Sequence, residues 1–138
     1  MREFLFRGKR VRNGEWVEGF YFNRNWEQII HHFIKYETWD EGMVTNEAIP
    51  ETVGQYTGLT DKNGKKIFEG DIVKTKYGRL CVVEWLSTQC FCGFDLTVYD
   101  FDFNSNTKAP GGWDLYFPEN LEIVGNIHDN PELLEVKE

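Results

Sequence analysis

Two cysteines separated by one residue are the first candidates for chemistry in this sequence. Cys90 and Cys92 lie in the segment Gln89–Gly93, with no basic residue beside them. A cysteine is an effective nucleophile only when a nearby base or positive charge favours its thiolate. Zinc sites use paired Cys-x2-4-Cys knuckles, whereas this chain has a single Cys-x-Cys. We therefore predict no metal site, and we interpret these two thiols and Cys81 as buried or half-buried side chains.

Histidine and carboxylate residues also lack a catalytic pattern. His31 and His32 are adjacent, so in a strand their side chains would point to opposite faces. Asp95, Asp100 and Asp102 could supply a carboxylate pair, but acids in loops and at strand rims are usually solvated surface groups. No glycine-rich phosphate-binding loop occurs. We predict no catalytic residue and no cofactor, and an enzyme is the class that the residues favour least.

Basic and aromatic residues in two segments form the candidate binding surface. Small β-barrels bind single-stranded nucleic acid by stacking bases on exposed rings beside a basic groove. The N-terminal segment offers four basic and three aromatic side chains: Arg7, Lys9, Arg10, Arg12, Trp16, Tyr21 and Trp26. The second segment offers five basic side chains: Lys65, Lys66, Lys74, Lys76 and Arg79. The alternative interpretation, in which the rings fill the core and the lysines decorate hairpin tips, stays open.

The charge balance favours a protein partner over a nucleic acid or a membrane. The formal net charge is −8, which opposes attraction to phosphate backbones and anionic lipids. Residues 1–12 nevertheless hold five basic side chains against one acidic one, and the segment from Cys81 onward holds two against eleven. Opposite charges could therefore join this chain to a partner or to a second copy, or the acidic segment could mimic nucleic acid.

Strands and tight turns dominate the predicted local structure. Asn13-Gly14 separates two β-prone segments, 6–12 and 15–22, and predicts a hairpin with a two-residue turn. Further strands are expected over residues 29–34, 52–56, 67–73, 80–85, 91–103 and 121–127. Loops are expected at residues 38–46 and 105–112. Asn130-Pro131 pairs an N-cap residue with proline at the first helical position, which predicts a short terminal helix.

This pattern predicts a mostly β fold, either a barrel or a sandwich. Seven to nine strand candidates with glycine-centred turns and almost no helix are typical of those architectures. The chain has 138 residues, of which 41% are hydrophobic and 16% aromatic, enough for one sizeable core. Its apolar runs are too short for a membrane helix or a signal peptide, so we expect a cytoplasmic protein. Pro50 marks a boundary between residues 1–50 and 51–138, which could also form one compact domain.

Several segments carry a more specific signal. They are Gln55–Val73, Val124–Leu134, and residues 6–9 and 13–19, and together they reach across nearly the whole chain. Each is similar to the corresponding part of the YopX family, small proteins encoded by bacteriophages and prophages, whereas residues 86–119 match nothing we can place. The resemblance implies an SH3-type β-barrel in residues 51–138 with an N-terminal β-hairpin segment on or beside it. It implies no catalytic residues.

These observations lead to one functional hypothesis and one alternative. We predict a phage or prophage accessory protein that is not an enzyme and that works by binding another protein, with self-association as one form of that binding. The alternative is a small nucleic-acid-binding β-barrel that acts in phage replication or regulation.

Overall fold

The structure of the protein, a computed structural model, describes residues 5–75, 78, 80–87, 92–98 and 118–134. The chain forms two compact units, Met1–Tyr56 and Thr57–Glu138. The sequence placed a boundary at Pro50, and that division stays a prediction. Each unit is described by itself below.

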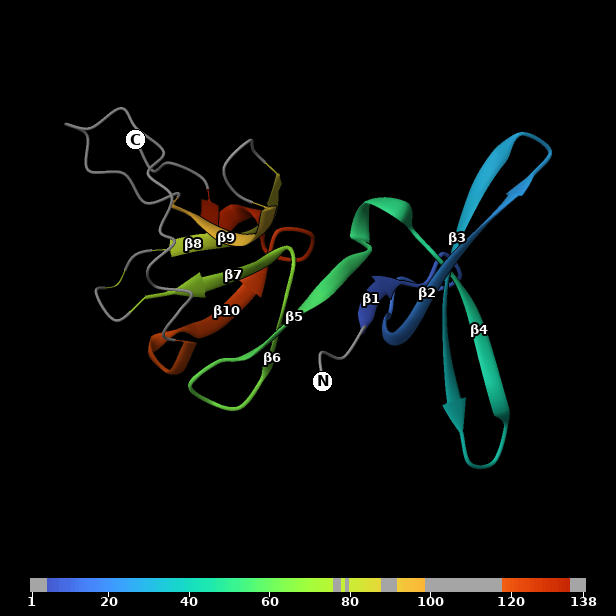
Figure 1. The fold of residues 1–138 in the computed structure, drawn as a ribbon, viewed down its shortest axis with the longest axis horizontal. Coiled ribbons are helices and arrows are strands. Elements are labelled where there is room, and N and C mark those ends of the chain that lie inside the picture. The colour runs from blue at the N-terminus through green and yellow to red at the C-terminus, as the bar shows by residue number, and fades with distance from the viewer. Residues whose placement is uncertain (1–4, 76–77, 79, 88–91, 99–117, 135–138) are drawn as a thin grey trace. The chain divides into compact units, whose positions relative to one another are not determined.

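The first unit is built on one antiparallel sheet with the strand order β4-β3-β2-β1-β5. Its strands are β1 (Phe6–Lys9), β2 (Trp16–Trp26), β3 (Ile29–Thr38), β4 (Gly42–Ala48) and the first part of β5 (Gly54–Thr60). β2 is much longer than β1, and only residues 16–19 of β2 pair with β1. The rest of β2 pairs with β3 alone, so the β2–β3 hairpin extends away from the other strands, as Figure 1 shows.

The β1–β2 hairpin predicted at Asn13-Gly14 is present, but its turn is longer than two residues. The Arg10 N–H donates to the Glu15 carbonyl (2.9 Å), and the Gly14 N–H donates to the Arg10 carbonyl (2.8 Å). Gly14 has a φ of 71°, in the left-handed region that favours glycine. The result is a four-residue loop, a common form of hairpin connection.

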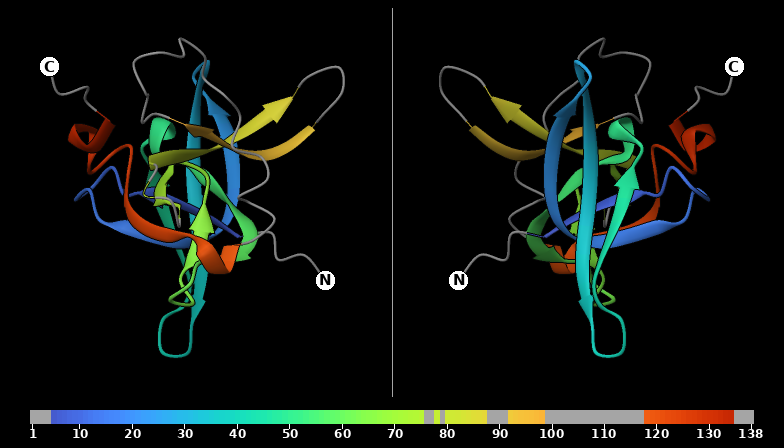
Figure 2. Two further views of the ribbon diagram at one scale, coloured as in Figure 1. Left: turned by 90° about the vertical axis from the view of Figure 1, so that its left-hand side faces the viewer. Right: turned by 90° about the vertical axis from the view of Figure 1, so that its right-hand side faces the viewer.

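The β3–β4 hairpin corrects a sequence prediction. Residues 38–46 were expected to be a loop because they are polar and contain glycine, yet β4 begins at Gly42 and pairs with β3 from Thr38 back to His32. Most of its polar side chains are exposed, which an edge strand tolerates. Figure 2 shows this hairpin and the β2–β3 hairpin pointing in opposite directions.

The core of the first unit forms where the sheet curls. Arg10 follows β1 and makes a bridge with Ala48 at the end of β4, so the two ends of the four-strand segment β1–β4 meet. The Val11 N–H donates to the Glu47 carbonyl (2.9 Å) at the same place. Val17, Ile34 and Ala48 are buried inside this curl.

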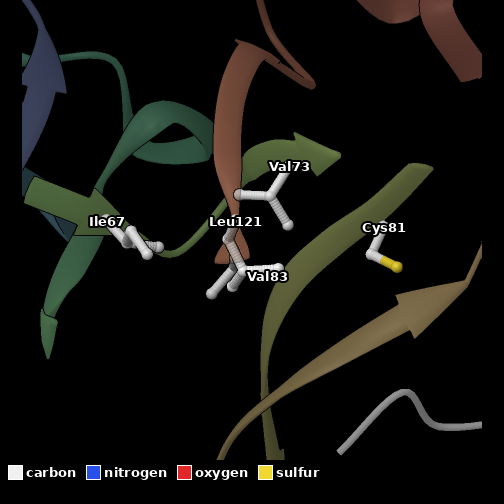
Figure 3. Close-up of a cluster of buried hydrophobic side chains, with 5 residues drawn as sticks. All are labelled: Ile67, Val73, Cys81, Val83 and Leu121. Carbon is white, nitrogen blue, oxygen red and sulfur yellow. The ribbon is translucent and has the colours of Figure 1, made fainter. Parts of the chain in front are cut away.

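The second unit contains a four-stranded antiparallel sheet with the order β10-β7-β8-β9. Its strands are β7 (Asp71–Lys74), β8 (Leu80–Ser87), β9 (Cys92–Val98) and β10 (Glu122–Asn126), and β6 (Lys66–Phe68) precedes them. Figure 3 shows the buried cluster of Ile67, Val73, Cys81, Val83 and Leu121. The strand expected over residues 80–85 is confirmed as β8, and its residues 81–83 are at most 1% exposed.

The mostly β prediction is confirmed, whereas the SH3-type barrel and the terminal helix are not. In the described part of the chain neither sheet closes into a barrel, and every helical segment is a short 3-10 turn: Pro50–Thr52, Pro118–Asn120 and Pro131–Leu134. The Asn130 Oδ1 accepts the Asn126 N–H (3.3 Å), and the Asn130 carbonyl accepts the Leu133 N–H (3.1 Å) in the last of these turns. Pro50–Thr52 also replaces the start of the strand expected over residues 52–56. The expected loop at 105–112 lies outside the described residues. None of the described helices is long and apolar enough to cross a membrane.

Candidate functional site

Three of the predicted surface residues meet on one face of the first sheet. Arg7 and Lys9 are two residues apart on β1, so their side chains point the same way, and Lys9 lies directly opposite Trp16 on β2. The Arg7 Cζ is 4.7 Å from the centre of the Trp16 ring, and the Lys9 Nζ is 5.4 Å from it. Trp16 therefore carries two cations over its ring system at distances typical of cation–π contacts.

The same face continues across β2 and β3. Phe22 lies opposite Phe33, and their rings stack with centres 5.0 Å apart and an angle of 15° between planes. The Lys35 Nζ lies 5.4 Å from the centre of the Phe22 ring. Phe20 is 59% exposed. We call this surface the outer face, and it consists of Arg7, Lys9, Trp16, Phe20, Phe22, Phe33 and Lys35.

The sequence did not identify Phe20, Phe22, Phe33 or Lys35 as part of this surface. The alternation of β2 is the signal that could have found the first two, because the even-numbered positions 16, 20, 22 and 26 all carry aromatic side chains. In a strand such positions share one face. The contribution from β3 depends on the hairpin register, which the sequence alone does not determine.

Tyr21 and Arg10 belong to the opposite side of the sheet. The Tyr21 ring packs against Phe6 with centres 5.3 Å apart, and its hydroxyl bonds to His32 Nδ1. Arg10 donates from Nη2 to the Tyr36 hydroxyl (2.9 Å) and forms an ion pair with Glu15 (3.3 Å). Both side chains therefore make contacts within the first unit, and these contacts stabilise its sheet.

Trp26 and Arg12 are exposed near the ends of two hairpins, and Trp26 is on the same side of β2 as Phe22. Arg12 is in the β1–β2 turn, and Trp26 is at the end of β2, where its ring centre is 6.1 Å from that of His31. His31 Nδ1 in turn contacts Glu47 Oε1 at 2.6 Å across β3 and β4. Trp26 is 69% exposed despite its contact with His31.

The lysines of the second unit that the structure describes lie at two separate places. Lys65 and Lys66 are exposed beside the turn at Gly64, and Lys74 is exposed at the end of β7. Lys76 and Arg79 lie outside the described residues. Lys74 lines a polar cavity of about 520 Å³ together with Lys62, Thr75, Gly78, Glu119, Asn120 and Glu122. An ion pair between Lys62 and Glu122 (3.2 Å) already balances charge in it.

Asp61 and Asp71, two carboxylates of the segment Gln55–Val73, accept hydrogen bonds from backbone N–H groups. Asp61 Oδ1 accepts the N–H groups of Asn63 and Lys65 (both 2.9 Å), and its Oδ2 accepts the Ile123 N–H (3.0 Å). Burial raises the pKa of Asp61, but these backbone donors and the Lys65 charge outweigh it and hold the pKa below the ordinary value. Asp71 Oδ2 likewise accepts the Phe68 N–H (2.8 Å). Asp61 and Asp71 therefore organise turns and strand starts.

Among the carboxylates that the structure describes, Glu69 has a raised pKa. Burial, and then the negative charge of Glu84, raise the pKa of Glu69 above its ordinary value. Within the described residues no three histidine, cysteine, aspartate or glutamate side chains lie close enough together to hold a metal ion. Cys81 is buried in the core of its unit, and the side chains of Cys90 and Cys92 are not among those described.

Comparison with known proteins connects this architecture to one family. The family model described as YopX protein matches residues 5–135. The crystal structure of protein EF1440 from Enterococcus faecalis is similar, with a TM-score of 0.55 and 21% sequence identity over 98% of this chain and 100% of that one. At that identity the similarity concerns the fold alone. A comparison with curated proteins gives no significant match.

Proposed function

Because this chain belongs to the YopX protein family, we propose that it is a phage or prophage accessory protein of the host cytoplasm that acts by binding another protein. It is not an enzyme in this proposal, and the contacts are made by the first unit. The second unit supplies a separate core, for which we propose the SH3-type barrel. The packing of Ile67 from β6 against Val73 and Val83 of β7 and β8 supports such an arrangement.

One observation carries the proposal of protein binding. Seven large apolar side chains of the first unit are more than half exposed, whereas the buried cluster that the described chain forms inside its curled sheet has only three members, Val17, Ile34 and Ala48. They are Val11, Phe20, Trp26, Ile29, Ile30, Trp39 and Met43. Exposed aromatic and methionine side chains are enriched where proteins contact one another.

A comparison of bound proteins tests the proposal. The tagged full chain, a Phe20→Ser/Met43→Ser variant and a Val124→Ser control are used to capture proteins from a bacterial lysate after nuclease treatment. Val124 is 37% exposed on the second unit, so its substitution removes apolar surface without changing the first unit. We expect a protein that the wild type and the control retain and that the double variant loses. Equal retention by all three forms would contradict the proposal.

Nucleic-acid binding is the second candidate, and the cations over Trp16 and Phe22 favour it. Rings flanked by Arg7, Lys9 and Lys35 resemble the stacking platforms of single-strand binders. The net charge of −8 weighs against it. Fluorescence anisotropy with labelled single-stranded oligonucleotides at low salt decides the question. Binding that weakens steeply with added salt and is lost on Trp16→Ala would support this candidate, and no binding at about 20 mM salt would end it.

A further inference from the structure

The end of the β2–β3 hairpin has structural features that the outer face does not explain. We call residues Asn23–His31 the arm tip. Among the described residues, β1 pairs with β2 only at residues 16–19, and β4 pairs with β3 only from residue 32 onward. The arm tip is therefore a two-stranded ribbon whose backbone pairs only within itself. Figure 1 shows it projecting beyond the other strands of the first unit.

The arm tip exposes apolar surface on both sides of this ribbon. Trp26 and Ile29 are opposite each other and share one side, and Ile30 points to the other. Their exposed fractions are 69%, 61% and 56%. A two-stranded ribbon is at best marginally stable in water when nothing covers its apolar side chains. A surface of this kind is expected where another molecule packs.

The turn of the arm tip adds to this instability. Glu27 and Gln28 have φ angles of 51° and 68°, in the left-handed region where two-residue hairpin turns normally place asparagine and glycine. Glutamate and glutamine adopt that backbone conformation only at an energetic cost. The pairing of β2 with β3 holds this conformation at a cost, and a contact that covers the Trp26–Ile29 pair would offset part of that cost.

The charge of the arm tip indicates which occupant fits. Arg24 is its only basic residue apart from His31, and Glu27 is its only acidic one, so its formal net charge is zero. A neutral tip gains nothing from attraction to a nucleic acid or an anionic lipid surface. In contrast, a twofold interface places two identical surfaces against each other. A tip with one positive and one negative side chain allows this, because opposite charges can face each other across the interface. Antiparallel packing about an axis at Trp26 brings Arg24 of each copy toward Glu27 of the other.

We propose that the arm tip packs against the arm tip of a second copy of this chain and forms a twofold dimer through Trp26 and Ile29, which share one side of the ribbon. The inference rests on the proposed function, because it names one protein partner of the first unit. An interface between two hairpin ends is small, and interfaces of less than about 1,200 Å² in total are typical of weak, reversible complexes. We therefore expect a dimer that dissociates in the micromolar range of chain concentration.

Sedimentation velocity on the nuclease-treated full chain, over about 5–500 μM, tests the dimer. We expect the wild type to change from monomer to dimer over this range. The Trp26→Ser/Ile29→Thr variant should raise the dissociation constant by about 30-fold or more, as the loss of central apolar contacts does in other interfaces. Trp39→Ser is the matched control: Trp39 is 96% exposed at the β3–β4 turn of the same unit, and its substitution should leave the dimer unchanged.

A second variant tests whether the tip substitutions act only by unfolding the ribbon. It carries Glu27→Asn/Gln28→Gly, the residues that the turn conformation favours, together with Trp26→Ser/Ile29→Thr. Circular dichroism confirms that the fold is intact, and the loss of the dimer should persist. A wild type that stays monomeric to about 500 μM, or a dimer that survives the tip substitutions, would overturn the inference. Neither result affects the lysate experiment, in which the tip is not altered, so protein binding through Phe20 and Met43 is judged separately.

Discussion

Gly19 of β2 lies against the backbone of Lys35 on β3 so closely that no side chain fits between them. A Cβ atom built on Gly19 would be 2.2 Å from the Lys35 carbonyl oxygen and 3.2 Å from a methyl carbon of Ile34. The two strands are paired immediately beyond this point, at Phe20 and Lys35. The close approach lets the sheet curl around Val17 and Ile34.

We predict from this contact that Gly19→Ala destabilises the first unit by about 2–4 kcal/mol. The added methyl group meets backbone, which cannot move aside as a flexible side chain would, so the strands must separate. Urea unfolding followed by tryptophan fluorescence measures the change. Glu18→Ala, at the exposed neighbouring position, should change the stability by less than about 0.5 kcal/mol. Equal stability of Gly19→Ala and the wild type would show that the close approach is absent.

The turn at Glu27-Gln28 leads to a prediction with the opposite sign. Replacing these residues with Asn-Gly should stabilise the chain by about 1 kcal/mol, because the new residues adopt positive φ at lower cost. The midpoint of urea unfolding should rise without a change in slope. Glu27→Gln keeps the unfavourable conformation and serves as the control. A double variant less stable than the wild type would mean that the hairpin has another turn geometry.

A comparison of turns shows how far the sequence alone could lead. Asn63-Gly64 is a residue pair typical of tight turns and forms one here, since Gly64 has a φ of 80° and its N–H donates to the Asp61 carbonyl (3.0 Å). The chemistry of that turn is local, so the residues themselves reveal it. Glu27-Gln28 could not be predicted because its residues disfavour the turn. The pairing of the long strands β2 and β3 imposes it, and that pairing depends on contacts distant in the sequence.

For the candidate surface, too, the sequence alone could identify only the part that depends on local structure. Arg7, Lys9 and Trp16, which the sequence analysis grouped together, lie close together because two strands joined by a recognisable hairpin carry them. Tyr21 was grouped with them by proximity in sequence, yet its odd-numbered position places it on the opposite side of β2, where it contacts Phe6. Lys35 was missed because it reaches Phe22 only through the β2–β3 register. Composition identifies the kinds of residues, and strand register decides which of them meet.

Asp61 should make the stability of the second unit depend on pH in the acidic range. Its pKa is lower in the folded chain than the ordinary value of 3.8, so the carboxylate contributes stability above that value. The contribution is lost as the pH falls through the lowered pKa. Asp61→Asn keeps the size but replaces one accepting oxygen with an N–H donor, which leaves backbone N–H groups unsatisfied. At pH 7 we expect a loss of about 1–3 kcal/mol.

Unfolding measured between about pH 2 and pH 7 checks this prediction. The difference in stability between the wild type and Asp61→Asn should be constant near neutral pH and should shrink as Asp61 becomes protonated. Asp40→Asn, at an exposed position in the β3–β4 turn, is the control and should change little. A difference that does not vary with pH would contradict the lowered pKa.

Glu69 should respond to pH in the opposite direction, because its pKa is raised by burial and by Glu84. A carboxyl group whose folded pKa exceeds its unfolded pKa binds more protons in the folded chain, so it destabilises the fold at neutral pH. Its contribution becomes more favourable as the pH falls through the raised pKa toward the ordinary value of 4.5.

NMR titration of the Glu69 side-chain carboxyl carbon should show a midpoint above that value. Glu84→Gln removes the neighbouring charge, so it should lower the midpoint while leaving the part caused by burial. Glu132→Gln, on the exposed terminal turn, should leave the midpoint where it is. An unchanged midpoint in Glu84→Gln would show that burial alone raises the pKa.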